Sequence, residues 1–155
     1  MTQPDERRLL SIMVDYLFGK GVCRALPKEG MRLVYSRRSG RVKLVYHGSR
    51  LFATVKPNGA MALSLYGATT LASKRPFLAN CVTVRGDVAQ FVRGGKSVFC
   101  KFVVSAGKRV GPRGEVAVLD PSGKVIGVGR ATMRGAFMSL FKSGVAVKVR
   151  EGLGA

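Results

Sequence analysis

The side chains of this chain that can take part in chemistry are mostly cations. Lys and Arg number 27 against 8 Asp and Glu, so the formal net charge is +19 at neutral pH. Dividing the chain after Ala79 leaves +10 in the first part and +9 in the second, so the charge does not come from a basic tail. A charge of this size repels itself in the compact state and is neutralised by a polyanion. The composition therefore favours a nucleic-acid ligand that contacts both parts of the chain.

The first candidate contact is the turn Gly94-Gly95-Lys96-Ser97. Backbone N–H groups of glycines, beside a Lys and a Ser hydroxyl, can hold a phosphate or a sugar edge. The alternative is a plain helix end with a tight turn, which is the commonest use of such glycines. The spacing is not that of a P-loop. The residues alone leave these two interpretations about equal.

The second candidate is the last strand that the sequence predicts. Alternating valines take one face of this strand, so Lys148 and Arg150 share the other face, about 7 Å apart at the rise of a strand. That separation matches the phosphates of a nucleic-acid strand. A solvated edge strand, kept soluble by its charge, is the alternative. Lys101 lies between Phe99 and Phe102 and can join the two cations. The two phenylalanines are expected in the core, with stacking on RNA bases as the weaker interpretation.

Two further basic segments lie on predicted turns. Arg37, Arg38 and Arg41 surround a Ser-Gly turn, and a hairpin tip with three guanidinium groups suits a phosphate backbone. The alternative is a solvated charge run. The loop Lys108–Arg113 is expected to be simply exposed, with a flexible phosphate contact as the weaker interpretation.

Catalytic and metal chemistry lack a suitable constellation of residues. His47 is the only histidine, and Cys23, Cys81 and Cys100 form no C-x-x-C pair. This spacing argues against a zinc site and a disulfide framework, and it favours three buried, inert thiols. The scattered acids are better explained as caps and turn formers, such as a helix cap at Asp87. We therefore predict no catalytic residues, no metal and no cofactor.

No segment has the features of a membrane span or a leader. The most apolar stretch, residues 9–18, is interrupted by Asp15 and is too short to cross a bilayer. Arg7 and Arg8 precede it, but no small-residue cleavage site follows. We expect a cytoplasmic protein without membrane contact.

The first part of the chain predicts one helix and a meander of strands. The helix covers Pro4–Phe18, and Thr2-Gln3-Pro4-Asp5 has the form of a capping box. Its apolar stripe, which needs something to cover, consists of Leu9, Ile12, Met13, Tyr16 and Leu17. The predicted strands, separated by turn formers, are Met31–Ser36, Arg41–Tyr46, Leu51–Val55 and Met61–Leu65. A short helix is expected over Gly67–Arg75.

The second part predicts a compact β structure. The expected strands are Cys81–Arg85, Ser97–Val104, Glu115–Leu119, Lys124–Thr132 and Val145–Arg150. A short helix from Asp87 to Arg93 ends at the glycine pair. Another helix covers about Arg134–Phe141 and uses Phe137, Leu140 and Phe141 as its buried face. Gly127 and Gly129 inside a strand indicate a bulge or a barrel corner.

The second part also resembles a known family. Its order of strand, short helix, Gly-Gly-Lys-Ser-Val-Phe, long strand, basic loop, hairpin, helix and final strand is similar to that of PUA domains, which are RNA-binding modules. Ser36–Val42 and Leu63–Ala68 resemble the module that precedes the PUA domain in archaeal tRNA-guanine transglycosylase, the archaeosine enzyme. The resemblance implies an α+β fold. A mixed helix and antiparallel-sheet module over 1–79 would be followed by a small PUA-like β-barrel over 80–155.

The resemblance also adds weight to the candidate contacts. In PUA domains the loop corresponding to Gly94–Ser97 lines the RNA groove, and the positions of Lys148 and Arg150 border it. It implies a non-catalytic RNA-binding protein with tRNA or another structured RNA as ligand. The alternatives are an RNA-holding subunit that serves a separate catalytic chain in tRNA modification, or a ribosome-associated translation factor.

Overall fold

The computed structural model describes residues 4–154 and divides into two compact units. The first unit ends at Pro76 and the second begins at Phe77, inside the short 3-10 helix Arg75–Asn80. Both units combine helices with antiparallel strands, so the predicted α+β class is confirmed. Thr2 and Gln3 of the expected capping box lie outside the described residues.

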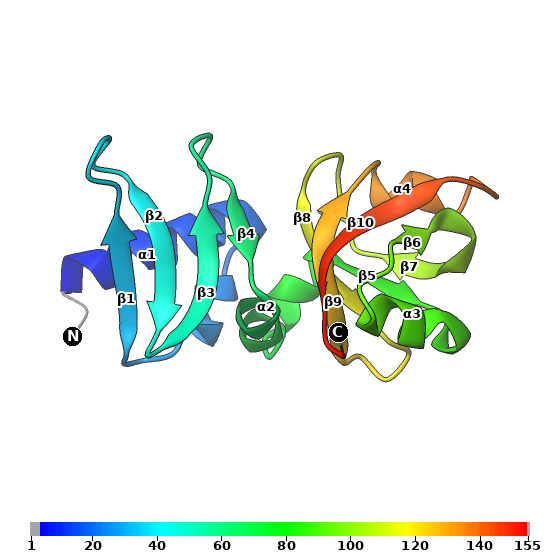
Figure 1. Cartoon of the computed structure of the whole chain (residues 1–155), viewed down its shortest axis with the longest axis horizontal. Helices are drawn as coiled ribbons and strands as arrows, with labels where there is room; N and C mark the ends of the chain where they lie inside the picture. Colours follow the sequence, from blue (N-terminus) through cyan, green and yellow to red (C-terminus); the bar gives the residue numbers. More distant parts are fainter. Residues whose placement is uncertain (1–3, 155) are drawn as a thin grey trace. The chain divides into compact units, whose positions relative to one another are not determined.

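The first unit is a four-stranded antiparallel sheet covered by one helix. Its elements are α1 (Pro4–Phe18), a 3-10 turn (Val22–Ala25), β1 (Met31–Tyr35), β2 (Val42–His47), β3 (Arg50–Val55), β4 (Met61–Leu63) and α2 (Leu65–Leu71). The strands follow one another in the order β1-β2-β3-β4, as a meander, and α1 runs across one face of this sheet (Figure 1). Ser64 caps α2 by accepting a hydrogen bond from the Gly67 N–H.

The face of α1 that is buried differs from the predicted one. Leu10, Val14 and Phe18 recur every four residues and are at most 3% exposed, so they form the helix side of the core. Leu9 and Ile12, which we expected to be covered, are instead 40% and 57% exposed. The helix has apolar residues on two faces, and the core needs only one.

The second unit is a barrel-like sheet. Its elements are β5 (Cys81–Val84), a 3-10 turn (Gly86–Val88), α3 (Ala89–Arg93), β6 (Val98–Phe99), a 3-10 turn (Cys100–Phe102), β7 (Val103–Ala106), β8 (Glu115–Leu119), β9 (Val125–Ala131), α4 (Gly135–Met138) and β10 (Val145–Gly152). The strand order is β6-β10-β9-β8-β5-β7, with β5 and β8 parallel and the other pairs antiparallel. The two edges, β6 and β7, are consecutive in the chain, so the sheet curls round until its ends nearly meet (Figure 1).

This closure explains why the predicted strand Ser97–Val104 is broken. Cys100–Phe102 forms a 3-10 turn that carries the chain from one edge of the sheet to the other. The Phe102 carbonyl accepts a hydrogen bond from the Arg85 N–H just beyond β5. A single straight strand cannot pair with β10 at one end and β5 at the other, because three pairings of the sheet separate these two strands, each of which lies next to an opposite edge.

Two predictions about the helices of this unit are wrong. The predicted helix Arg134–Phe141 is a single turn, α4, and it buries Met138. Phe137, Leu140 and Phe141 are 45%, 72% and 51% exposed, so they are not its core face. Asp87 does not cap a helix with its side chain, because its carboxylate pairs with Arg85 at 2.8 Å.

The glycines in β9 have close neighbours, which are backbone at Gly129 and first of all a valine side chain at Gly127. A Cβ on Gly129 would lie 2.0 Å from the Lys148 carbonyl oxygen, and one on Gly127 would lie 3.0 Å from Val92. The β10 register shifts beside them, between Val149 and Glu151. The bulge predicted from these glycines is present.

Candidate nucleic-acid interface

The Gly94–Ser97 turn is a helix end, and its glycine N–H groups are already used. Gly95 adopts φ +91°, donates to the Val92 carbonyl at 2.9 Å, and is followed by Lys96, which donates to the Phe91 carbonyl at 2.9 Å. This pair of bonds is the Schellman arrangement that ends a helix at a left-handed glycine. The expectation that these backbone groups hold a phosphate is therefore wrong. Any contact from the turn must come from the Lys96 and Ser97 side chains.

These two side chains border an apolar pocket that the sequence analysis missed. The pocket has a volume of about 260 Å³ and is lined by Val88, Phe91, Val92, Lys96, Ser97, Val98, Phe99 and Phe102. Phe91 and Phe99 are 54% and 46% exposed. Phe99 and Phe102 meet edge to face, with their ring centroids 6.5 Å apart. The expectation that Phe99 belongs to the core is wrong, and two rings of the pocket are open to a ligand.

Cations surround the rings. The Lys101 ammonium lies 5.0 Å from the Phe102 ring centroid, and the Arg85 guanidinium lies 5.6 Å from it. Lys96 and Lys101 are both exposed. An apolar aromatic pocket with cations at its rim suits an unstacked base whose flanking phosphates meet the cations.

Lys148 lies next to the turn, as the strand register shows. Val147 of β10 pairs with Val98 of β6, so the adjacent residues Lys148 and Ser97 occupy neighbouring positions. On its other side, Lys148 pairs directly with Arg130 of β9, and both are exposed. Like charges placed directly opposite each other destabilise a sheet. An anion bound between them would remove this cost.

Arg150 does not lie free in solvent as expected. Its guanidinium forms an ion pair with Glu115 of β8 at 2.8 Å, and the side chains of the two residues are 37% and 7% exposed. The Glu115 carboxylate is thus buried, and the Arg150 guanidinium compensates its charge. Arg150 thus joins β10 to β8 through this ion pair, and Arg130 of β9 is the arginine that lies directly opposite Lys148.

The arginine hairpin belongs to the first unit. Arg37, Arg38 and Arg41 are all exposed, and the turn closes through a hydrogen bond from the Ser36 N–H to the Arg41 carbonyl at 2.8 Å. The Arg41 guanidinium donates to the Pro57 carbonyl at 2.8 Å, which fixes its direction. Arg37 and Arg38 form the outward cationic tip.

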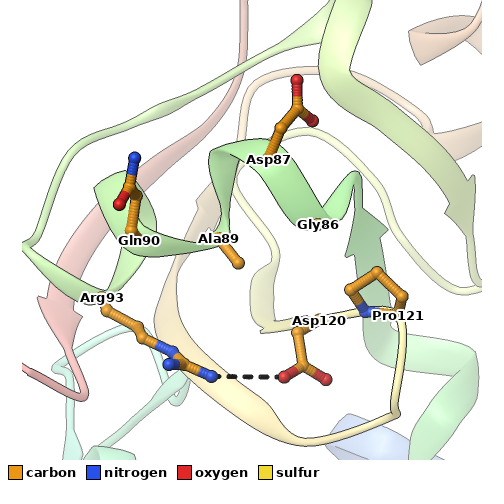
Figure 2. Close-up of a pocket in the computed structure, with 7 residues that line it drawn as sticks. All are labelled: Gly86, Asp87, Ala89, Gln90, Arg93, Asp120 and Pro121. Carbon is orange, nitrogen blue, oxygen red and sulfur yellow. Dashed lines mark hydrogen bonds and ion pairs between the residues drawn. The ribbon is translucent and has the colours of Figure 1, made fainter.

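A second hollow on the barrel is a poor phosphate site. It measures about 530 Å³ and is lined by Gly86, Asp87, Ala89, Gln90, Arg93, Asp120 and Pro121. Figure 2 shows the Arg93 guanidinium directed at the Asp120 carboxylate, 3.3 Å away, rather than into open space. Two carboxylates and one engaged arginine would repel a phosphate more than attract it.

Asp120 itself organises a turn. Its Oδ1 accepts hydrogen bonds from the Ser122 hydroxyl, the Ser122 N–H and the Lys124 N–H, at 2.6, 3.0 and 3.0 Å. These bonds, led by the Ser122 hydroxyl, hold the pKa of this carboxyl below its usual 3.8. This matches the expected role of a turn former.

The cysteines and the histidine have structural surroundings. Burial raises the pKa of the Cys81 thiol to about 12 and also raises the pKa of Cys23 and Cys100, so none is an activated nucleophile. Cys23 is only half-buried, contrary to expectation.

His47 stacks on Tyr66, whose hydroxyl lies 2.6 Å from the His47 Nδ1. Within residues 4–154, no three His, Cys, Asp or Glu side chains gather to hold a metal, and no helix is long and apolar enough to cross a membrane.

Comparison with known proteins accounts for both units. Residues 8–77 match the patch-forming domain C2 of tRNA-guanine transglycosylase, and residues 80–153 match the PUA domain. The chain carries a C2 domain followed by a PUA domain. Both parts of the resemblance noted in the sequence are confirmed.

Archaeal tRNA-guanine(15) transglycosylases share this pair of domains. The Thermoplasma volcanium enzyme is 34% identical over 143 residues, which cover 90% of this chain and 22% of that protein. The Thermococcus onnurineus enzyme is 32% identical over 148 residues, which cover 95% of this chain and 25% of that protein. The chain is homologous to the carboxyl-terminal region of these enzymes and spans about a quarter of their length.

Solved structures share the fold of the whole chain. A conserved PUA domain protein from Thermoplasma acidophilum aligns with a TM-score of 0.68 and 20% identity over 100% of this chain and 93% of that one. A hypothetical protein from Pyrococcus horikoshii gives a TM-score of 0.72 and 16% identity over 97% and 92%. The fold therefore persists where little sequence identity remains.

Proposed function

We propose that the protein binds RNA through its PUA domain and has no catalytic activity of its own. The main support for this proposal is the phenylalanine pocket bordered by Lys96 and Lys101. Lys148 of β10 and Arg130 of β9 add two exposed cations on the neighbouring strands. Exposed aromatic rings bind unstacked bases, and the cations bind the phosphates. The outward Arg37 and Arg38 of the C2 domain would extend the contact on a large RNA.

We take tRNA as the favoured ligand, because the relatives that share both domains are named as tRNA-guanine(15) transglycosylases. This favours tRNA over a ribosomal site. A second candidate function is supported by the same homology. The chain would hold RNA for a catalytic partner in tRNA modification, since it corresponds to about a quarter of those enzymes.

The proposal is tested by the salt dependence of binding to a tRNA transcript. Replacing Lys96 and Lys148 with Ala removes two phosphate contacts, so the slope of log affinity against log salt flattens by about 1.4–1.8. Lys108→Ala with Arg113→Ala removes the same charge from an exposed loop of the same domain and flattens the slope less. Equal flattening in both variants would mean that diffuse charge, not this site, binds the RNA.

A further inference from the structure

The outer face of α1 is apolar although it does not pack on the core of its own unit. Leu9, Ile12 and Tyr16 follow one another at i, i+3 and i+7 and are 40%, 57% and 82% exposed. The core face of the same helix, with Leu10 and Val14, points the other way. A surface helix normally pairs one apolar face with a polar one. A helix that is apolar on two sides is typical of one buried between two bodies.

A groove continues this face onto the sheet. It has a volume of about 880 Å³, and Leu9 and Met13 of α1 form one side of it. Its remaining lining comes from β1, β2, β3 and the two hairpin loops, in particular Tyr35, Val42, Lys43, Val55, Arg38 and Arg41. Most of the lining surface is apolar, and its charged side chains include Arg38, Arg41 and Lys43. Tyr35 of the lining donates its hydroxyl to the Glu6 carboxylate at 3.1 Å. Together, the outer α1 face and this groove form one surface, called here the α1 groove.

The charge around the α1 groove selects its occupant. A second copy of a chain with a charge of +19 would bring one basic rim against another, which opposes self-association. RNA gains little from aliphatic side chains such as Leu9 and Ile12, which offer neither a stacking plane nor a hydrogen bond. A protein segment with apolar side chains flanked by Asp and Glu would pack its apolar side chains on the apolar lining and pair its carboxylates with the basic side chains. In the transglycosylases, moreover, three quarters or so of the polypeptide lies outside the shared region, so a large protein body accompanies these domains there.

We propose that the α1 groove is a docking surface for an acidic amphipathic segment of a partner protein. The segment inserts apolar side chains between α1 and the hairpin loops and places its carboxylates against Arg41 and Lys43. This surface lies in the C2 domain and does not depend on the RNA site of the PUA domain. The protein partner would then occupy a surface separate from the PUA pocket that binds RNA.

The probe is a synthetic amphipathic helical peptide with leucines on one face, Glu on both flanks and one Trp. The chain contains no Trp, so the fluorescence of the peptide reports binding directly. A twin peptide carries Lys in place of each Glu. We expect the Glu peptide to bind and the Lys twin to bind at least about 10-fold more weakly.

Leu9→Ser with Ile12→Ser removes two aliphatic contacts and should weaken Glu-peptide binding at least about 10-fold. The matched control, Leu140→Ser with Phe141→Ser, changes two exposed apolar residues of the PUA domain and should leave affinity within about 2-fold. Lys43→Glu guards against a folding artefact in the α1 variant, because it reverses one exposed charge on the rim. It should weaken the Glu peptide and strengthen the Lys twin.

The proposal is overturned if the two peptides bind equally, if the control pair loses as much affinity as the α1 pair, or if Lys43→Glu leaves the peptide preference unchanged. It is also overturned if the α1 pair loses affinity for a tRNA transcript while its Glu-peptide binding is unaltered. That last result would assign the α1 groove to RNA.

Discussion

Arg150 and Glu115 form an ion pair that joins β10 to β8 across the intervening strand β9, with 2.8 Å between Nη2 and Oε1. The Glu115 side chain is 7% exposed, so the cation compensates a carboxylate that has left water. Arg150 therefore braces the barrel, and its contact with RNA stays a prediction. Lys148 and Arg130, which lie directly opposite each other on β10 and β9, are both exposed.

The first prediction concerns this brace. Arg150→Ala leaves the buried Glu115 carboxylate uncompensated and should lower the free energy of unfolding by about 1–3 kcal/mol. Adding Glu115→Gln to the same variant removes the stranded charge and should recover part of that loss. Lys148→Ala, at an exposed site, should stay within about 0.5 kcal/mol of wild type. Urea denaturation of the four proteins checks this, and equal stability of Arg150→Ala and Lys148→Ala would refute it.

The second prediction concerns pH. The pKa of Asp120 is lowered on folding, so the charged carboxylate contributes stability that is complete above its unfolded value near 3.8 and is lost as pH falls through the lower folded value. The difference in unfolding free energy between wild type and Asp120→Asn should therefore be largest near neutral pH. It should shrink progressively as the pH falls below about 5.

The control for Asp120 is Asp87→Asn, which breaks an exposed pair with Arg85 and should cost no more than about 1 kcal/mol at neutral pH. Urea midpoints at several pH values measure both variants. A difference between wild type and Asp120→Asn that is constant with pH would contradict the role assigned to this carboxylate.

The third prediction separates two glycines. Gly95→Ala has open space for its Cβ and suffers only from φ +91°, which costs about 1–2 kcal/mol. It should leave the salt slope of RNA binding unchanged, because the N–H groups of the turn are bonded within the helix end. Gly129→Ala would place a Cβ 2.0 Å from the Lys148 carbonyl oxygen and should destabilise the barrel more. A flatter salt slope in folded Gly95→Ala would restore the glycine turn as a phosphate site.

Local patterns in the sequence were enough to predict much of the fold. The bounds of α1 follow from its apolar spacing, and the glycines of β9 mark the bulge where they are found. The errors come from partners distant in sequence. Helical spacing shows that Leu9 and Leu10 both lie on apolar faces of α1, but only the sheet decides that Leu10 is covered. The run Ser97–Val104 reads as one strand, and barrel closure breaks it at Cys100.

The sequence was enough to predict the cations of the candidate site, but not the exposed aromatic rings beside them. Lys96, Lys101 and Lys148 can be singled out from charge and alternation. The sequence favours the core for Phe99 and does not single out Phe91, whereas the folded PUA domain leaves both rings exposed around one pocket. The ion pair between Arg150 and Glu115 joins residues 35 positions apart, so no local sequence pattern predicts it.

The most direct test of RNA binding at the PUA pocket is photo-crosslinking of the whole chain to a tRNA transcript, followed by tryptic digestion and mass spectrometry. Cleavage after Arg85, Arg93, Lys96 and Lys101 separates the pocket rings, with Phe91 in peptide 86–93 and Phe99 in peptide 97–101. The account predicts nucleotide adducts on both peptides and their loss when a high salt concentration releases the RNA. Adducts confined to the first unit, with none on residues 86–101, would contradict it.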